Sequence, residues 1–433
     1  MPSEAIRALA QLAKESCPAL SSLPVAHRNK ALLAIADALE AHRDELLAAS
    51  ALDVADAEAA ALPTPIISRL RLTPEKCDRM AEGLRALCLL PDPLRRVEYA
   101  RELCPGQRLY RVTCPIGVVG VIFESRPDAL VQISSLCLKS GNAVLLKGGR
   151  EAARTNELLH RLIVEATARA GMPNGWCALL HSREDVADML KLDDCIDLII
   201  PRGSNAFVRY IMENSLIPVL GHAEGLCHVY VDAAADRDLA VKIIVDSKTQ
   251  SLAVCNATET LLVHRAIAAD FLPIAKQALE AKGVQLRGCE RARAIIHCLP
   301  ATEEDWRAEY LDLILSIRVV DSLDAAIEHI NRYGSGHTDC IVSRDGAAIE
   351  TFMTRVDSAG VFSNCSTRFS DGFLCGFGAE VGIATGKLHA RGPMGLEGLC
   401  TYKYRLYGNG QTLAELNEGT IALTHRELER RLP

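Results

Sequence analysis

Short apolar segments alternate with amphipathic segments over residues 117–364, and this alternation limits the folds open to the chain. Strands of a parallel sheet are buried on both faces, so they read as apolar runs joined by helices that cover the sheet. The pattern predicts an α/β fold. The first set of expected strands is 117–123, 143–147, 177–181, 196–201, 217–220 and 228–231, and the helices between them are 129–140, 151–170, 183–190, 204–214 and 236–248.

A second set of the same kind follows residue 257. Its expected strands are 258–264, 294–298, 315–320, 339–342 and 360–364, with helices at 266–282, 323–332 and 345–356. A chain of 433 residues is longer than one hydrophobic core normally organises. We therefore expect two doubly wound α/β domains that meet near residues 248–258, and clefts between domains commonly hold small molecules.

The two ends of the chain differ from this middle part. Residues 4–15 and 26–60 carry apolar positions at helical spacing, which predicts an N-terminal helical layer. Residues 97–102 and 108–113 alternate polar and apolar side chains around Pro105-Gly106, which indicates a β-hairpin. A third alternating segment lies at 401–407. We expect these elements to pair and project from the body, leaving an open edge that needs a partner.

Charge and cysteine content exclude several classes of protein. The net charge is −7 with both signs interspersed, so we expect no nucleic-acid or membrane-binding face. The chain has no apolar run of transmembrane length and no secretory leader pattern, and its 16 cysteines lack disulfide-scaffold spacing. A cytoplasmic protein with reduced thiols is expected. Metal binding is not expected, because the sequence has no Cys-x-x-Cys pair, and His222 and His228 have no third ligand near them in the sequence.

Cys255 is the candidate nucleophile. It lies in the small-residue connection 251–257, ahead of an expected strand, and a thiol on a connection is accessible for covalent chemistry. The alternative is that Cys255, as one of many cysteines, is a small buried apolar residue.

Two strand-to-helix turns are candidate phosphate sites, although no Gly-x-Gly-x-x-Gly fingerprint follows any expected strand. The first, 145–150, contains Lys147 and two glycines, and the second, 200–205, contains Arg202, Gly203 and Ser204. Free amides at a helix start attract phosphate, but a tight turn is the favoured interpretation of each segment taken alone.

Four separated motifs resemble the gamma-glutamyl phosphate reductase family, within the aldehyde dehydrogenase superfamily. They are 115–128, 138–149, 378–383 and 391–397, and the resemblance extends from about residue 5 to 415. It implies an NADP-binding domain at 1–93 and 115–249, a catalytic domain at 250–395, and an oligomerisation β element at 94–114 and 398–413.

The family resemblance also implies the reaction. NADPH reduces L-glutamate 5-phosphate to L-glutamate 5-semialdehyde and phosphate is released, in proline biosynthesis. Cys255 corresponds to the catalytic cysteine. Lys147 corresponds to the lysine at the adenosine ribose, Gly203 and Ser204 to the turn near the pyrophosphate, and Glu309 to the glutamate at the nicotinamide ribose. The sequence leaves open NADPH against NADH, homodimer against homotetramer, and an association with glutamate 5-kinase.

A thiolate at Cys255 would displace phosphate to give a thioester, and hydride from the nicotinamide would reduce it to the aldehyde. Backbone amides near Cys255, and the amide of Asn256, are candidates for stabilising the oxyanions. Hydrolytic relatives carry a glutamate base where this chain has Val219, so phosphate rather than water is the expected acyl partner. The segment 124–127 replaces the superfamily's usual oxyanion asparagine.

Substrate recognition requires cations for the phosphate and the α-carboxylate, and an acceptor for the ammonium group. Arg126, Arg202 and Arg368 are the candidate cations and Asp371 the candidate acceptor, although each arginine could instead pair with a structural carboxylate. Two rival functions remain: a CoA-acylating or other aldehyde dehydrogenase, and a relative without catalytic activity.

Overall fold

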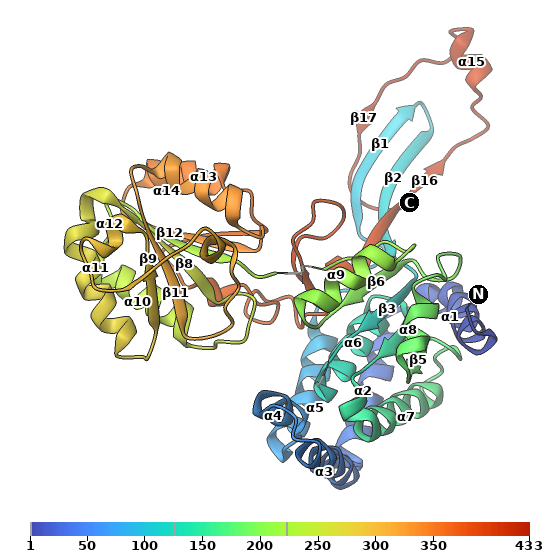
Figure 1. Cartoon of the computed structure of the whole chain (residues 1–433). Helices are drawn as coiled ribbons and strands as arrows, with labels where there is room; N and C mark the ends of the chain where they lie inside the picture. Colours follow the sequence, from blue (N-terminus) through green and yellow to red (C-terminus); the bar gives the residue numbers. More distant parts are fainter. Residues whose placement is uncertain (1, 125, 222–223) are drawn as a thin grey trace.

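The computed structural model describes residues 2–124, 126–221 and 224–433. Ser125 and His222, which belong to motifs named above, lie outside the described residues. The chain forms two α/β bodies and a long β arm, as Figure 1 shows. Two α/β bodies and a projecting β element are the architecture that the sequence predicts.

The first body is built on four parallel strands in the order β5-β4-β3-β6. Strands β3 and β4 are buried at every position because helices cover both faces, which explains their unbroken apolar sequences. The strands are β3 (Val118–Ile122), β4 (Ala143–Lys147), β5 (Cys177–Leu180) and β6 (Leu198–Pro201), and the helices between and after them are α6 (Pro127–Lys139), α7 (Ala153–Arg169), α8 (Arg183–Met189) and α9 (Asn205–Asn214).

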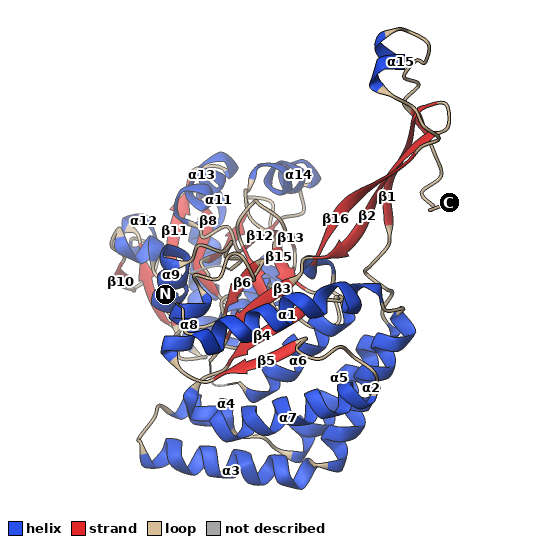
Figure 2. Ribbon diagram, turned by 90° about the vertical axis from the view of Figure 1, so that its right-hand side faces the viewer, coloured by secondary structure: helices blue, strands red, loops and turns tan. Residues whose placement is uncertain are grey.

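Five N-terminal helices surround this sheet. They are α1 (Glu4–Ser22), α2 (Val25–Ala41), α3 (Arg43–Ala59), α4 (Thr64–Leu70) and α5 (Pro74–Leu89). Helix α1 packs on one face together with α8, whereas α2, α3 and α5 share a core with the opposite face, and α4 packs against α3; Figure 2 shows α2–α5 beneath the sheet. Side chains of α2 and α5 share one apolar core with α6, α7 and the sheet. The predicted helical layer is therefore present.

The second body is built on seven parallel strands in the order β10-β9-β11-β8-β7-β12-β13. The strands are β7 (Cys227–Val231), β8 (Thr258–His264), β9 (Gln285–Gly288), β10 (Leu299–Pro300), β11 (Ile314–Val320), β12 (Thr338–Val342) and β13 (Gly360–Ser363). Their helices are α10 (Arg237–Thr249), α11 (Arg265–Glu280), α12 (Glu290–Arg293), α13 (Leu323–Tyr333) and α14 (Gly346–Arg355). A separate two-stranded sheet, β14 (Gly382–Ala384) and β15 (Gly392–Met394), follows.

Three expectations differ from the structure. Strand β7 and helix α10 belong to the second body, because β7 lies between β8 and β12, so the boundary expected at residue 249 is too late in the chain. Residues 217–220 make a single bridge, between Val219 and Ile199, instead of a strand. Residues 294–298 follow α12 as irregular chain in which Ile296 is buried, so their apolar character reflects core packing and not a strand.

The arm contains the predicted hairpin, β1 (Val97–Cys104) and β2 (Gln107–Pro115), which turns at Gly106 with φ of +78°. The predicted third strand, β16 (Cys400–Tyr407), pairs with β2 along its whole length. The C-terminal segment returns along the arm through α15 (Leu413–Asn417) and β17 (Arg426–Glu427), and β17 pairs with β1. The strand order β16-β2-β1-β17 leaves one edge of β16 open.

All sixteen cysteines, each within the described residues, are free thiols. No helix in the described part of the chain is long and apolar enough to cross a lipid bilayer.

A buried ion pair anchors the base of the arm. Arg28 of α2 is fully buried, and its guanidinium donates to both carboxylate oxygens of Asp92, at 2.9 and 2.8 Å, and to the backbone carbonyl of Lys139. Asp92 lies in the linker between α5 and β1 and also accepts the Leu94 N–H at 3.1 Å. The start of the arm is thus tied to two helices of the first body.

We predict that Asp92→Ala destabilises the protein by about 3–5 kcal/mol, because the Arg28 guanidinium would stay buried without its counter-ion. The matched control is Asp194→Ala, which breaks an exposed pair with Arg7 and should cost less than about 1 kcal/mol. Chemical denaturation curves measure both. Equal losses in the two variants would contradict this account.

Candidate active site

Cys255 lies in a turn between α10 and β8, at the amino end of β8, where the two bodies meet. A glycine permits this placement: a Cβ built on Gly225 would lie 2.6 Å from both the Cα and the Cβ of Cys255. The predicted nucleophile therefore lies on a connection, as expected, and no larger side chain fits at position 225 without moving it.

His337 lies within hydrogen-bonding distance of the sulfur. Its Nε2 lies 3.2 Å from Cys255 Sγ, and its Nδ1 lies 2.9 Å from the hydroxyl of Thr338. His337 is 1% exposed and directly precedes β12. On the other side of the imidazole, the thiol of Cys227 donates to the backbone carbonyl of Cys255 at 3.3 Å. The reactive turn is therefore enclosed by β7, β8 and β12.

Charged groups of the first body also face Cys255. Arg202 directly follows β6. Its guanidinium lies 3.6 Å from the carboxylate of Glu380 and donates to the backbone carbonyl of Glu380 at 3.3 Å. The pKa of the Cys255 thiol is raised to about 12, mainly by burial and also by Glu380 and Glu309, while Arg202 acts in the opposite direction. At neutral pH the thiol is therefore protonated in this state, and forming the thiolate requires a proton acceptor.

A cavity of about 610 Å³ lies on the Arg202 side of the site. Its lining brings together Arg126, Arg202 and Asp371, three of the four predicted substrate residues, with Glu380. Helices α4 and α5 add Arg69, Lys76 and Arg79 to the wall, so the cavity is rich in cations. Such a lining suits an anionic ligand.

Arg368 and Asn256 do not have the surroundings that the sequence suggested. Arg368 is absent from the lining of this cavity and donates from Nε to Gln250 at 2.9 Å. The side-chain amide of Asn256 donates to the carbonyl of Ser370 at 3.0 Å, so one of its two amide hydrogens is used. Asn256 thus holds the 366–371 loop, and the backbone amides of the turn remain the candidate oxyanion donors.

Besides lining the cavity, Asp371 stabilises the turn that carries it. Its Oδ1 accepts the backbone N–H groups of Phe373 and Leu374, at 2.9 and 3.0 Å. The residue therefore fixes the turn that carries it and lines the cavity, and its role as the ammonium acceptor stays a prediction.

The predicted cofactor residues surround the carboxyl ends of β4 and β6. Lys147 is 6% exposed, and its ammonium group contacts the carbonyl of Gly148; burial lowers its pKa. Gly203 and Ser204 begin α9, and a Cβ on Gly203 would lie 2.9 Å from the carboxyl carbon of Glu124. Glu309 reaches the same helix from the second body, since its Oε2 accepts the Asn205 amide at 2.7 Å.

A buried ion pair supports the loop that carries Glu309. Lys248 and Glu259 are at most 1% exposed, and the ammonium group donates to Oε2 of Glu259 at 2.5 Å. The other carboxylate oxygen accepts the Leu311 N–H at 3.3 Å. The strand that follows Cys255 thus fixes the loop of Glu309, and the two predicted site residues are held in one unit.

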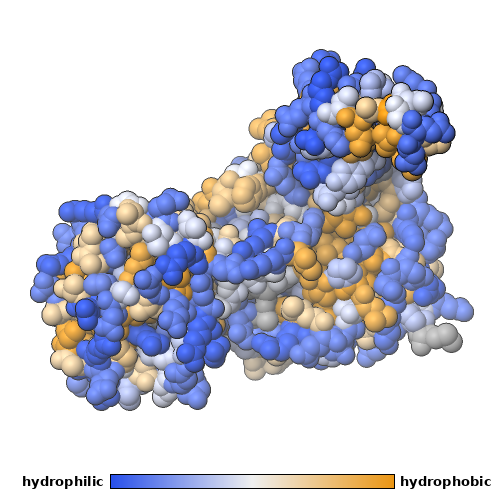
Figure 3. Space-filling model, turned by 90° about the horizontal axis from the view of Figure 1, so that it is seen from above, coloured by the Kyte–Doolittle hydropathy of each residue, from blue (hydrophilic) through white to orange (hydrophobic). Residues whose placement is uncertain are grey.

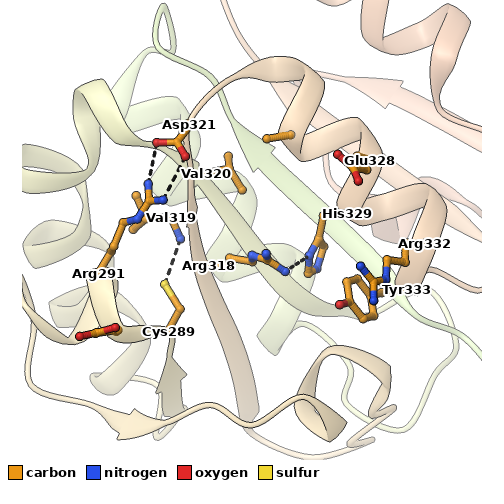
Figure 4. Close-up of a pocket in the computed structure, with 12 residues that line it drawn as sticks. Cys289, Arg291, Arg318, Val319, Val320, Asp321, Glu328, His329, Arg332 and Tyr333 are labelled. Carbon is orange, nitrogen blue, oxygen red and sulfur yellow. Dashed lines mark hydrogen bonds and ion pairs between the residues drawn. The ribbon is translucent and has the colours of Figure 1, made fainter.

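A second cavity, of about 330 Å³, lies at the carboxyl ends of β9 and β11, and Figure 4 shows its lining. Two of its cations already have partners: Arg291 binds both oxygens of Asp321, at 2.6 and 3.0 Å, and Arg318 donates to His329 at 2.8 Å. Cys255 lies at the opposite edge of the sheet, ahead of β8, so this cavity is separate from the site.

Three residues at the site were not singled out from the sequence: His337, Glu380 and Asn205. Glu380 and Asn205 lie inside segments quoted above, where a carboxylate beside glycines and an amide at a helix start were the available signals. His337 follows Gly334-Ser335-Gly336 and precedes a strand, and a lone histidine in that position carries little information.

Comparisons with known proteins agree with this geometry. Residues 1–287 match the aldehyde dehydrogenase family. The gamma-glutamyl phosphate reductase of Pelotomaculum thermopropionicum is 57% identical over 98% of this chain and 97% of its own length, and gamma-glutamyl phosphate reductase 1 of Synechocystis is 55% identical over 98% of each.

Solved structures give the same result. The crystal structure of gamma-glutamyl phosphate reductase from Thermotoga maritima is 39% identical, with a TM-score of 0.92 over 94% of this chain and 99% of that one. An acetylating aldehyde dehydrogenase from Geobacillus thermoglucosidasius, at 18% identity and a TM-score of 0.67, shares the fold. The chain therefore belongs to the aldehyde dehydrogenase family and, within it, to the gamma-glutamyl phosphate reductases.

Proposed function

We propose that the protein reduces L-glutamate 5-phosphate to L-glutamate 5-semialdehyde in proline biosynthesis, with Cys255 as the nucleophile and NADPH as the reductant. The observation that carries the proposal is the position of Cys255 beside Arg202, which lines the cation-rich cavity. The relatives named gamma-glutamyl phosphate reductase, which match nearly the whole chain, support the choice of substrate.

The residues present fit a nicotinamide dinucleotide, the cofactor class of this family. A buried ammonium group ends β4, a bare glycine turn opens the ten-residue helix α9, and Glu309 presents a carboxylate beside that turn. We assign the adenosine ribose to Lys147, the pyrophosphate to Gly203 and Ser204, and the nicotinamide ribose to Glu309. Lys147 and Arg150 favour NADPH, because two cations suit a 2′-phosphate. When bound, the cofactor supplies the hydride that reduces the thioester.

Residues of the chain itself would bind the substrate and form the thioester. Arg126 and Arg202 bind the phosphate and the α-carboxylate, and Asp371 accepts the ammonium group. The Cys255 sulfur attacks the acyl carbon, the bond to phosphate oxygen breaks, and a thioester remains. Val219 offers no carboxylate where hydrolytic relatives have a base, and Glu380 is held by Arg202, so the thioester is protected from water.

We assign residues 1–93 and 115–226 to cofactor binding, residues 227–395 to catalysis, and the arm to homo-oligomerisation in a cytoplasmic enzyme. The open edge of β16 carries exposed Tyr404 and Leu406. Figure 3, which views the arm from its outer end, shows apolar side chains there, where Leu413 and Leu423 are exposed. An open edge with apolar side chains favours pairing with a second copy. The free cysteines support a reducing compartment.

The reverse reaction tests the proposed chemistry. With glutamate semialdehyde and NADP⁺, we expect cofactor reduction that requires inorganic phosphate and falls by at least about a thousandfold in Cys255→Ala. Absorbance of the reduced cofactor measures the rate. Turnover without phosphate would show that water is the acceptor, and turnover that requires CoA would show an acylating dehydrogenase.

Arg202→Met should raise the KM for phosphate in that assay by about tenfold to a hundredfold, because a guanidinium fork on the anion is lost. Arg368→Met, which removes an arginine outside the cavity lining, should change it by less than about threefold. Initial rates over a phosphate series measure both values. An unchanged KM in Arg202→Met would remove this residue from the phosphate site.

Replacing Tyr404 and Leu406 by lysine should shift the protein to a smaller oligomer, because charge on an open strand edge opposes pairing. Leu89→Lys, at another highly exposed leucine, is the control and should leave the mass unchanged. Light scattering coupled to gel filtration gives the mass. The same mass in all three proteins would place the interface elsewhere.

A further inference from the structure

The cations near Cys255 do not account for the deprotonation of its thiol. Its thiol is surrounded by protein and lies near two carboxylates, Glu309 and Glu380, so its proton is held tightly. With a pKa of about 12, only about one part in 10⁵ would be thiolate at pH 7. Arg202, the cation that opposes this, is already paired with Glu380. An efficient nucleophile in this position needs a base within hydrogen-bonding distance.

We propose that His337 is the general base of this enzyme: its Nε2, 3.2 Å from the sulfur, takes the proton of Cys255. The inference rests on the proposed function, in which Cys255 is the nucleophile. It adds a catalytic residue that neither the sequence motifs nor the matched relatives assign. The imidazole touches the reacting atom directly, and its other neighbours decide which nitrogen carries the ring hydrogen.

The hydrogen-bond chain behind the ring selects the required tautomer. The Thr338 hydroxyl donates its hydrogen to Ser370 Oγ at 2.9 Å, so toward Nδ1 of His337 it can act as an acceptor. This places the ring hydrogen on Nδ1 and leaves the lone pair on Nε2, facing the thiol. Cys227 is consistent with the assignment, because its own hydrogen is given to the carbonyl of Cys255. Thr338 is thus a positioning residue.

The surroundings of His337 also suit a transient charge. Burial raises the pKa of the neighbouring Cys227 thiol well above its usual value, so that group stays neutral. Asp339, the next acid along β12, is held by His228 at 2.7 Å and by Ser358 at 2.5 Å. Around the sulfur the charged groups are Arg202, Glu309 and Glu380. Proton transfer would therefore create an ion pair of imidazolium and thiolate with no net charge.

The proton and electron balance closes over the cycle. Proton transfer from sulfur to Nε2 precedes formation of the C–S bond, and the C–O bond to phosphate breaks with its electron pair on the leaving oxygen. Solvent protonates the released phosphate. After hydride addition, the C–S bond breaks, the aldehyde forms, and the sulfur regains its proton from His337. One proton is consumed per turnover, as reduction of an acyl phosphate requires.

Alkylation of Cys255 by iodoacetamide tests this inference without substrate or cofactor. Peptide mass spectrometry would follow the rate against pH in the wild type, His337→Gln and His337→Asn, with exposed Cys375 as the internal control. We expect Cys255 in both variants to react at least about tenfold more slowly at pH 7.5, with the midpoint about one pH unit or more higher, and Cys375 to be unaffected. Identical Cys255 profiles in the three proteins would overturn the proposal.

The reductase assay then separates a catalytic role from a structural one. In His337→Gln, kcat should fall by about a hundredfold to ten-thousandfold while the KM for phosphate changes by less than about threefold. A thermal unfolding midpoint equal to wild type would establish that the variant is folded. If the wild type shows no reductase activity, the proposed function fails, whereas the alkylation profiles still decide whether His337 activates Cys255.

Discussion

The burial of one thiol determines how the rest of this site is arranged. Cys255 lies between two α/β bodies, and the protein that desolvates its sulfur also raises the pKa of its thiol. In the proposed reaction, the same burial would limit the access of water to a thioester at Cys255. Two contacts characterise the surroundings of the sulfur: Arg202 pairs with Glu380, and His337 lies within hydrogen-bonding distance of the thiol.

The two bodies contribute different halves of the site, and the connections between them are few and specific. Arg202 and the turn that opens α9 come from the first body, while Cys255, His337 and Glu309 come from the second. The bond from Asn205 to Glu309 crosses between the bodies and joins the two expected ends of the cofactor site. Within the second body, the buried pair of Lys248 and Glu259 ties the loop of Glu309 to the strand after Cys255. Movement of either body would therefore change nucleophile and cofactor residues together.

Much of the fold follows from local patterns. The buried strands β3 and β4 and the alternating strands of the arm have sequence periods of their own, and these were correctly placed. The boundary near residue 249 was misplaced because β7 has the same apolar character in either sheet, and only its pairing with β8 and β12 decides the assignment. Residues 294–298 look like a strand because a buried turn and a buried strand need the same side chains.

The sequence by itself determined the α/β class, the arm and the family, and it supplied Cys255 as the candidate nucleophile, because each of these is written in contiguous motifs. Tertiary structure decided which other side chains reach the sulfur. His337 is 82 residues away from Cys255 in the chain, and their contact exists because β12 and β8 flank β7 in one sheet. Tertiary structure also decided that Arg202 lines the cavity and that Arg368 does not. Strand order and helix packing set such distances, and no local pattern of residues encodes them.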